Sequence, residues 1–194
     1  MFSEKWKKEI VTLPNLLSFF RIVLIPVYLT VYRNAASHGQ YLLAGSILSV
    51  SCMTDMIDGM IARKCHMITN VGKVLDPLAD KLTQLALILS LSGRYSALIP
   101  VLILFLVKEC FQCGALFFFA QKGKVLPGAL PAGKICTTVL FLSFIVLVLF
   151  PQLPSSAVTL LAATDLCFLL VSFSHYLMAY WGGDGFLTDL NRDT

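Results

Sequence analysis

Charged residues are scarce in this sequence. Only 13% of its 194 residues are Asp, Glu, Lys or Arg, whereas 57% are hydrophobic. Soluble domains average about a quarter charged residues, so the charge here is too low to cover a water-facing surface. The shortage excludes a soluble globular protein and indicates that the chain uses lipid as its solvent. Six crossings of about 20 apolar residues each leave room only for short loops and tails, which also excludes a large extramembrane domain.

A disulfide framework and a nucleic-acid-binding charge pattern are also absent. The six cysteines are scattered along apolar stretches, which is typical of buried, reduced thiols. Cys110 and Cys113 form a lone CxxC without a second pair, so no metal or redox role is expected there. The net charge of +4 comes from basic residues near the ends of apolar segments, which set membrane orientation, and it does not imply a nucleic-acid partner.

Long apolar runs, by contrast, are abundant. They cover residues 15–33, 40–61, 74–91, 96–120, 135–150 and 156–181, with Gly, Pro or charged residues between them. Residues 2–11 mix apolar side chains with Lys and Glu, which favours a short helix lying along the membrane surface. The sequence therefore predicts an all-α integral membrane protein, a single domain over 1–194, with six transmembrane helices and a short N-terminal amphipathic interfacial helix.

The distribution of basic residues predicts the orientation. Six crossings place both termini on one side, and only Arg33 and Arg94 fall on the other. The side of the termini holds ten basic residues: Lys5, Lys7, Lys8, Arg63, Lys64, Lys73, Lys122, Lys124, Lys134 and Arg192. Because cytoplasmic loops carry an excess of Lys and Arg, we expect a multi-pass protein of the cell (cytoplasmic) membrane with both termini in the cytoplasm.

Four of the eleven acidic residues lie within 26 positions, around the cytoplasmic ends of the second and third runs: Asp55, Asp58, Asp76 and Asp80. Ionisable groups at membrane depth cost about 3 kcal/mol each on insertion scales, so their presence indicates a function. Within each pair the spacing of three or four residues puts both carboxylates on one helix face. Two antiparallel helices joined by a short loop can bring all four into one cytoplasmic site.

Clustered carboxylates repel one another unless cations neutralise them. Ligation by oxygen alone favours Mg²⁺ or Mn²⁺ over Zn²⁺, which prefers Cys and His. Two such ions suit displacement at a phosphorus atom, because they neutralise the charge that develops on the leaving phosphate. Gly59 and Gly72 would let a nucleotide or pyrophosphate approach the backbone closely, and Arg63 offers a planar fork for phosphate oxygens.

The whole pattern is specific. It reads Asp55-x-x-Asp58-Gly59-x-x-Ala62-Arg63, then eight residues, then Gly72-x-x-x-Asp76-x-x-x-Asp80. At about 6% per residue type, these eight positions match by chance on the order of 10⁻¹⁰ per window. They resemble the signature of the CDP-alcohol phosphotransferase family (class I CDP-alcohol phosphatidyltransferases), membrane enzymes of phospholipid synthesis. The TLPNLL run at 12–17 and the LDPLADK run at 75–81 resemble the phosphatidylglycerophosphate synthases and related cardiolipin synthases of that family, and the chain as a whole is most like the former.

The resemblance implies a role for each signature residue. Asp55, Asp58 and Asp76 would be the main ligands of two divalent ions, Mg²⁺ or Mn²⁺. Asp80 would contact one ion and act as general base toward the acceptor hydroxyl that attacks CDP-diacylglycerol and expels CMP. The nucleotide and pyrophosphate would lie against Asp58, Gly59, Ala62, Arg63 and Gly72. Family members are often homodimers, so a homodimer is expected as well.

The acceptor implied by the resemblance is sn-glycerol 3-phosphate, with Lys134, Lys108 and Arg21 as candidate contacts. The chain has Lys108-Glu109 where these synthases usually carry Arg-Glu, and Cys136 where they often carry a second Lys. Structural ion pairs are equally open for the membrane-embedded Arg21 and Lys108, with Glu109, Asp165 and the aspartate cluster as candidate partners. A cardiolipin synthase that uses phosphatidylglycerol is an alternative. An ion-coupled transporter, whose acidic residues would spread over more helices, is another.

Overall fold

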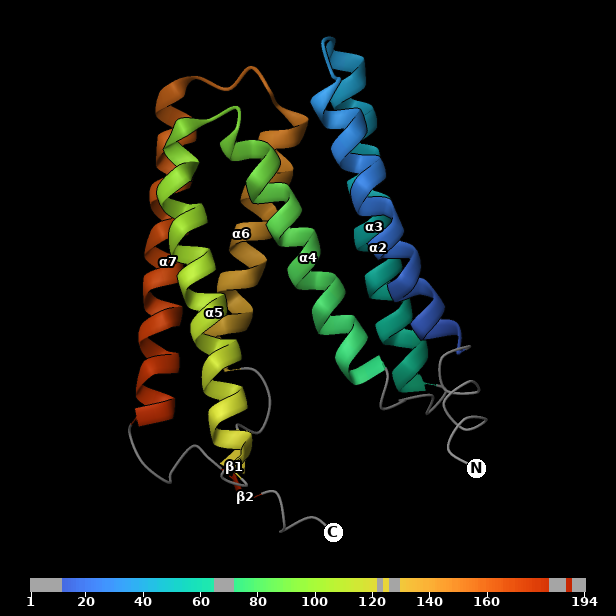
Figure 1. Cartoon of the computed structure of the whole chain (residues 1–194). Coiled ribbons are helices and arrows are strands. Elements are labelled where there is room, and N and C mark those ends of the chain that lie inside the picture. The colour runs from blue at the N-terminus through green and yellow to red at the C-terminus, as the bar shows by residue number, and fades with distance from the viewer. Residues whose placement is uncertain (1–11, 65–71, 122–123, 126–129, 182–187, 190–194) are drawn as a thin grey trace. The chain divides into compact units, whose positions relative to one another are not determined.

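The computed structural model describes residues 12–64, 72–121, 124–125, 130–181 and 188–189. Within these ranges the chain forms six long helices, shown in Figure 1: α2 (Leu13–Arg33), α3 (His38–Lys64), α4 (Gly72–Ser92), α5 (Ile99–Gln121), α6 (Pro131–Leu149) and α7 (Ser155–Trp181). A short 3-10 helix, η1 (Ser96–Leu98), precedes α5. Each long helix coincides with one of the six apolar runs, so the helical prediction is confirmed for all six. The interfacial helix expected over 2–11 lies outside the described residues.

Prolines explain several features of these helices. Pro14 lies in the first turn of α2 and Pro131 is the first residue of α6, positions at which a missing N–H removes no hydrogen bond from the helix. Arg33 ends α2, where its positive charge complements the partial negative charge of a helix C-terminus. Pro77 lies inside α4, between Asp76 and Asp80, where a proline removes one backbone hydrogen bond.

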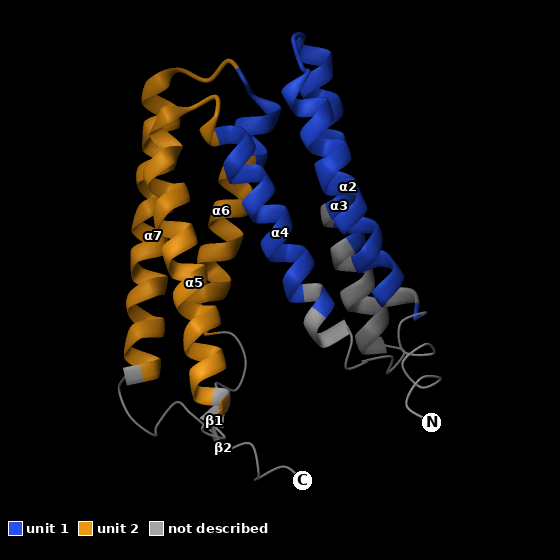
Figure 2. Cartoon of the chain, in the orientation of Figure 1, with its two compact units in different colours: residues 1–91, 145–151 blue, residues 92–144, 152–194 orange. Residues whose placement is uncertain are grey.

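The helices divide into two compact units, which Figure 2 colours separately. The first unit comprises Met1–Leu91 and Ile145–Pro151. In it α2 packs along α3, and the buried apolar side chains include Leu48 of α3 and Leu87 of α4. Gly45 of α3 lets α6 approach closely, because a Cβ at that position would meet the side chain of Leu149.

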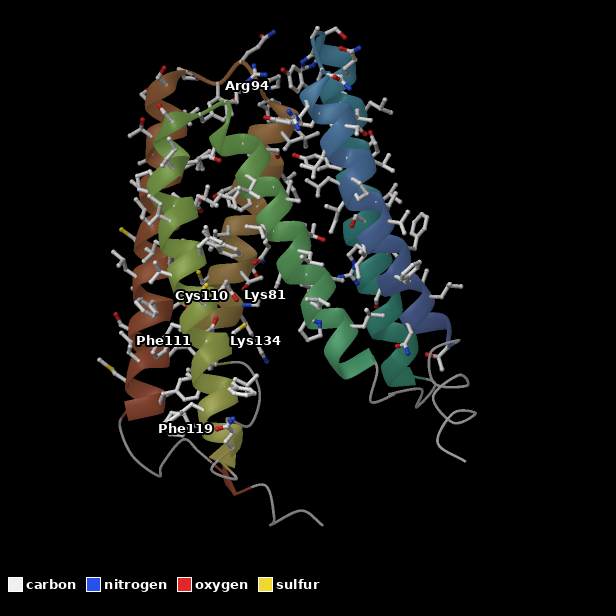
Figure 3. All side chains as sticks on the ribbon, in the orientation of Figure 1. Lys81, Arg94, Cys110, Phe111, Phe119 and Lys134 are labelled. Atoms are coloured by element: carbon white, nitrogen blue, oxygen red, sulfur yellow. The ribbon has the colours of Figure 1, made fainter. Side chains whose placement is uncertain are left out.

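The second unit comprises Ser92–Phe144 and Gln152–Thr194, and in it α5 packs against α7. Aromatic pairs line this contact. The Phe111 ring meets the edge of Phe173 with the ring centres 5.4 Å apart, and Phe119 stacks on Tyr180 at 5.3 Å; Figure 3 labels Phe111 and Phe119. Each such pair contributes about 0.5–1.5 kcal/mol beyond its burial. The aromatic pairs therefore help to hold α5 and α7 together.

A two-stranded antiparallel ladder departs from the all-α prediction. β1 (Lys124–Val125) pairs with β2 (Thr188–Asp189), with Lys124 opposite Asp189 and Val125 opposite Thr188. Strands of two residues carry no alternating pattern long enough to be recognised in a sequence. The chain is otherwise helical within the described ranges, so this ladder corrects the prediction only locally.

The helices present a largely apolar exterior. Among the described residues, four helical stretches are long and apolar enough to cross a membrane: Asn15–Arg33, Ser96–Phe119, Pro131–Leu149 and Ser155–Tyr180. Large apolar side chains on them, such as Phe117, Leu160 and Met178, are exposed. Extensive exposed apolar surface of this kind suits contact with lipid. Several apolar helices thus indicate a multi-pass membrane protein. The helices with the aspartates, α3 and α4, are not among the four stretches.

The cysteines correct one sequence-based expectation. Cys136 is buried, but Cys110, Cys113 and Cys167 are exposed on their helices, and all four are free thiols. The prediction of burial is therefore wrong for three of them. A thiol behaves as a small hydrophobic group, so a lipid-facing helix surface accommodates it as readily as a core does. The side chain of Cys52 and the whole of Cys65 lie outside the described residues.

Candidate active site

The four aspartates of the signature lie on two helices of the first unit. Asp55 and Asp58 belong to the last part of α3, and Asp76 and Asp80 to the first part of α4. These two helix ends lie at the same end of the unit (Figure 1). The helical backbone at these positions agrees with spacings of three and four residues along one helix face, and the placement of the carboxylates themselves stays a prediction.

Only Asp80 among the four aspartates has a described side chain. The helical backbone is described at the other signature positions, but their side chains are not: Asp55, Asp58, Gly59, Ala62, Arg63, Gly72 and Asp76. Among the described side chains, no group of three His, Cys, Asp or Glu is placed to hold a metal ion. Three of the four expected ligands lie outside that search, so the proposed metal site stays a prediction.

Asp80 is an accessible carboxylate with a buried partner. Its side chain is 50% exposed, and its Oδ1 accepts a hydrogen bond from Nη1 of Arg21 in a salt bridge. Arg21 lies on α2, and its side chain is only 2% exposed. The contact joins two helices across 59 positions of sequence. It places one of the three candidate acceptor residues directly beside the candidate general base.

Buried polar side chains continue from Arg21 along α2. Asn15, Ser18 and Arg21 are buried and follow one another at intervals of three, which puts them on the same side of the helix. Thr54 and Thr83 are also buried, and their hydroxyls donate to carbonyls of their own helices, at Val50 and Ala79. Among the described side chains of this unit, Ser51 of α3 and Gln84 of α4 are buried as well. Each of the three helices thus contributes buried polar side chains.

A small cavity shows that α2, α3 and α4 converge. Its lining is mostly aliphatic, but it includes the polar side chains of Tyr28, Ser51 and Thr83, one from each helix. The Tyr28 hydroxyl also lies 3.1 Å from Oγ of Ser90 in a hydrogen bond between α2 and α4. This hydrogen bond links α2 to α4 in the stretch that follows Asp80.

Lys108 is buried on α5 of the second unit, where its ammonium group contacts three other side chains. Its Nζ donates to Oε1 of Glu109 at 2.9 Å and to Oε1 of Gln112 at 3.0 Å. It also lies 5.6 Å from the centre of the Tyr176 ring, on α7. Because the ammonium already interacts with a carboxylate, an amide oxygen and the face of an aromatic ring, few of its N–H groups remain to bind a ligand. Its surroundings therefore favour a structural role.

Lys134 lies in the first turn of α6 and is exposed; Figure 3 labels its side chain. The preceding Gly133 is buried, and a Cβ there would lie only 2.7 Å from Oη of Tyr176. A residue with a side chain could not occupy this position unless Tyr176 moved. The absence of a side chain at Gly133 thus lets α7 pack closely against the start of α6, beside an accessible lysine.

Asp165 of α7 is fully buried and has a different partner from those expected. Its Oδ1 accepts a hydrogen bond from Oγ of Ser143 at 2.8 Å, while Oδ2 has no hydrogen-bond partner among the described residues. Asp165 was one of the candidate partners for Arg21 and Lys108, beside Glu109 and the aspartate cluster, and the described salt bridges use those other two. Arg21 pairs with Asp80, and Lys108 pairs with its neighbour Glu109.

Sequence reasoning missed several of these polar groups. The interval of three between Asn15, Ser18 and Arg21 was a usable signal, because it places polar residues on one side of an apolar helix. Ser143 and Tyr176 gave no comparable signal. Their partners lie on other helices, so only the packing of α6 with α7 reveals them.

Comparison with known proteins decides the family. Residues 11–175 match the family model described as CDP-alcohol phosphatidyltransferase. The chain belongs to this family. The match covers both aspartate-bearing helices in full, and it confirms the family resemblance found in the sequence.

Relatives of this CDP-alcohol phosphatidyltransferase include proteins with two kinds of name. The CDP-diacylglycerol–glycerol-3-phosphate 3-phosphatidyltransferase of Bacillus subtilis is 32% identical over 180 residues, which cover 87% of this chain and 86% of the relative. The protein of the same name from Rickettsia bellii is 33% identical over 136 residues, 70% of this chain and 72% of the relative. The cardiolipin synthase (CMP-forming) of Streptomyces coelicolor is 28% identical over 146 residues, 73% of this chain and 66% of the relative.

Proposed function

We propose that this CDP-alcohol phosphatidyltransferase transfers the phosphatidyl group of CDP-diacylglycerol to sn-glycerol 3-phosphate, giving phosphatidylglycerophosphate and CMP. One observation carries the choice of reaction. The similarity to the Bacillus subtilis protein, whose name states these two substrates, extends over 87% of the chain. The similarity to the Rickettsia bellii protein supports the same choice.

Asp80 is the proposed general base. Its carboxylate is half exposed at the aspartate-bearing end of α4, so an acceptor hydroxyl can reach it. In the proposed step Asp80 takes the hydroxyl proton while the hydroxyl oxygen forms a bond to the β-phosphorus. The bond from that phosphorus to the bridging oxygen breaks, and its electron pair leaves with CMP. A positioned base typically contributes about 10²–10⁴-fold to such a rate.

The residues at this end of the unit fit a pair of divalent ions. The four aspartates offer oxygen ligands only, on two helix faces, and this donor set suits Mg²⁺ or Mn²⁺. Asp55, Asp58, Asp76 and Asp80 would hold them. Such ions, when bound, supply neutralisation of the charge that builds up on the leaving phosphate. The proposed nucleotide and pyrophosphate contacts are those that the signature implies: Asp58, Gly59, Ala62, Arg63 and Gly72.

Lys134 is the proposed contact for the phosphate of the acceptor. It is exposed in the first turn of α6, whereas Arg21 and Lys108 are buried and engaged in salt bridges. A lysine ammonium with accessible N–H groups can bind a phosphate without first breaking an ion pair. This difference ranks Lys134 above the other two candidate residues.

Cardiolipin synthesis is the second candidate function, with phosphatidylglycerol as acceptor. Two observations favour keeping it. A Streptomyces coelicolor relative carries the name cardiolipin synthase (CMP-forming). The described part of the candidate site also offers few accessible basic groups, and an acceptor hydroxyl without a terminal phosphate group needs fewer of them.

The proposed membrane arrangement rests on the six apolar runs and on the distribution of basic residues between them. All six long helices, α3 and α4 included, would cross the bilayer, and both termini and the active site would face the cytoplasm. The chain would act as one domain, 1–194, and assemble as a homodimer. CMP release would distinguish this enzyme from an ion-coupled transporter, which would move a substrate without cleaving CDP-diacylglycerol.

The test is an acceptor panel. Purified protein would receive Mg²⁺ or Mn²⁺ and CDP-diacylglycerol with sn-glycerol 3-phosphate, phosphatidylglycerol or no acceptor, and the phospholipid product would be identified by mass spectrometry. We expect phosphatidylglycerophosphate from the first mixture and negligible product from the second. Cardiolipin from the second mixture would instead establish the alternative. Absence of any phospholipid product from either mixture would contradict both functions.

A further inference from the structure

The proposed reaction does not explain why Arg21 is buried. It is 2% exposed in the middle of α2, an apolar helix long enough to cross a membrane. A buried guanidinium is strongly unfavourable unless a partner compensates its charge. The burial of a guanidinium in this helix therefore indicates a function for Arg21.

The described salt-bridge partner of Arg21 is Asp80. Nη1 of Arg21 donates to Oδ1 of Asp80, the candidate general base, and no other aspartate side chain of the signature is described. Half of the Asp80 side chain remains accessible, which leaves surface for a hydroxyl group to approach.

The difference in exposure separates two roles for Arg21. A direct contact to the acceptor requires guanidinium surface that a ligand can reach, and a side chain with 2% exposure offers almost none. Holding Asp80 requires no such surface. A residue that holds Asp80 must instead be rigidly placed itself. Arg21 meets this requirement, because it lies in the interior of a helix, on the side that also buries Asn15 and Ser18.

We propose that Arg21 is a positioning residue, which holds the Asp80 carboxylate in the orientation that accepts the proton of the acceptor hydroxyl. Arg21 acts through Asp80 and does not touch the acceptor. The inference rests on the proposed function, in which Asp80 is the base. Arg21 is therefore no longer a candidate contact for the acceptor.

Steady-state kinetics of Arg21→Gln and Arg21→Lys test this role. We expect Arg21→Gln to lower kcat at least tenfold and to leave KM for CDP-diacylglycerol and sn-glycerol 3-phosphate within about twofold, because substrate binding is untouched. Arg21→Lys keeps a positive charge and should recover part of kcat. The matched control is Arg33→Gln, at the exposed end of the same helix, which should change neither constant. A rise in KM for sn-glycerol 3-phosphate with unchanged kcat would show an acceptor contact and overturn the inference.

A second readout does not depend on turnover. The thermal midpoints of Arg21→Gln, Asp80→Asn and the double variant form a double-mutant cycle. If the two side chains are paired, the double variant should lose clearly less than the sum of the two single losses. Additive losses would overturn the inference.

The outcomes also separate the two proposals. An active wild-type protein together with wild-type kcat in Arg21→Gln would contradict the positioning role alone. A wild-type protein that releases no CMP with either acceptor would contradict the proposed function, and the positioning role with it.

Discussion

At the scale of single residues, the three basic residues implied as acceptor contacts differ in their surroundings. Arg21 is buried against Asp80 and Lys108 is buried against Glu109, whereas Lys134 is exposed. The sequence shows their charge and their position along the helices. It does not show burial or partners, because each depends on which side of a helix faces another helix.

Lys134→Gln tests the proposed phosphate contact. Loss of a hydrogen bond to a charged group removes about 1.5–3 kcal/mol, which corresponds to roughly 10–100-fold in binding. We therefore expect KM for sn-glycerol 3-phosphate to rise by that factor while KM for CDP-diacylglycerol stays unchanged. Initial-rate kinetics over both substrates would measure it. Thr138→Ala, an exposed change one turn further along α6, is the control; an unchanged KM in Lys134→Gln would remove Lys134 from the site.

The hydrogen bond between Ser143 and Asp165 yields a prediction about stability. Ser143→Ala leaves Oδ1 of a fully buried carboxyl group without its described donor, and an unsatisfied buried group costs about 1–3 kcal/mol. The thermal midpoint in detergent should fall accordingly. Adding Asp165→Leu removes the unsatisfied group and should restore most of the loss. A double variant less stable than Ser143→Ala alone would show that Asp165 has a further stabilising role.

Much of the candidate site could be predicted at the residue scale, and the limits have physical causes. The spacing of Asp55, Asp58, Asp76 and Asp80 indicates two helix faces, because helical periodicity is a local property. The salt bridge between Arg21 and Asp80 spans 59 positions and no local pattern encodes it. The hydrogen bond from Ser143 to Asp165 was not predicted, for the same reason.

At the scale of helices, the six apolar runs predicted the six long helices closely. Apolar length and the Gly, Pro and charged residues between runs are sufficient for that. Neither α3 nor α4, which carry the signature aspartates, is among the four stretches of the described residues that are long and apolar enough to cross a membrane, so the crossing of these two helices stays a prediction. The ladder of β1 and β2 was missed because two-residue strands leave no periodic signal.

Close packing of α6 and α7 at Gly133 yields a prediction with an internal control. Gly133→Ala would place a Cβ 2.7 Å from Oη of Tyr176, and overpacking of this kind costs about 1–3 kcal/mol. Gly114→Ala on α5 meets nothing within 4 Å and should be neutral or stabilising by up to about 1 kcal/mol, because alanine favours a helix. Thermal unfolding in detergent would compare them. Equal midpoints for the two variants would contradict the close contact.

At the scale of the whole molecule, the exposed apolar side chains and the family membership agree on a multi-pass membrane enzyme. The orientation is a prediction from the basic residues. Single cysteines placed at positions 36 and 152, in a cysteine-free background, should react with an impermeant maleimide added outside intact cells. A cysteine at position 4 should react only after the membrane is permeabilised. External labelling at position 4 would contradict cytoplasmic termini.

Asp80, on a helix of this CDP-alcohol phosphatidyltransferase, is proposed as the base in a reaction that releases CMP. A decisive experiment compares CMP release by purified wild-type protein and Asp80→Asn, with CDP-diacylglycerol, sn-glycerol 3-phosphate and Mg²⁺, alongside CMP binding to both. We expect release by the wild type, a rate lower by about 10²–10⁴ in Asp80→Asn, and similar CMP binding. No release by the wild type, or a near-normal rate in Asp80→Asn, would contradict this proposal.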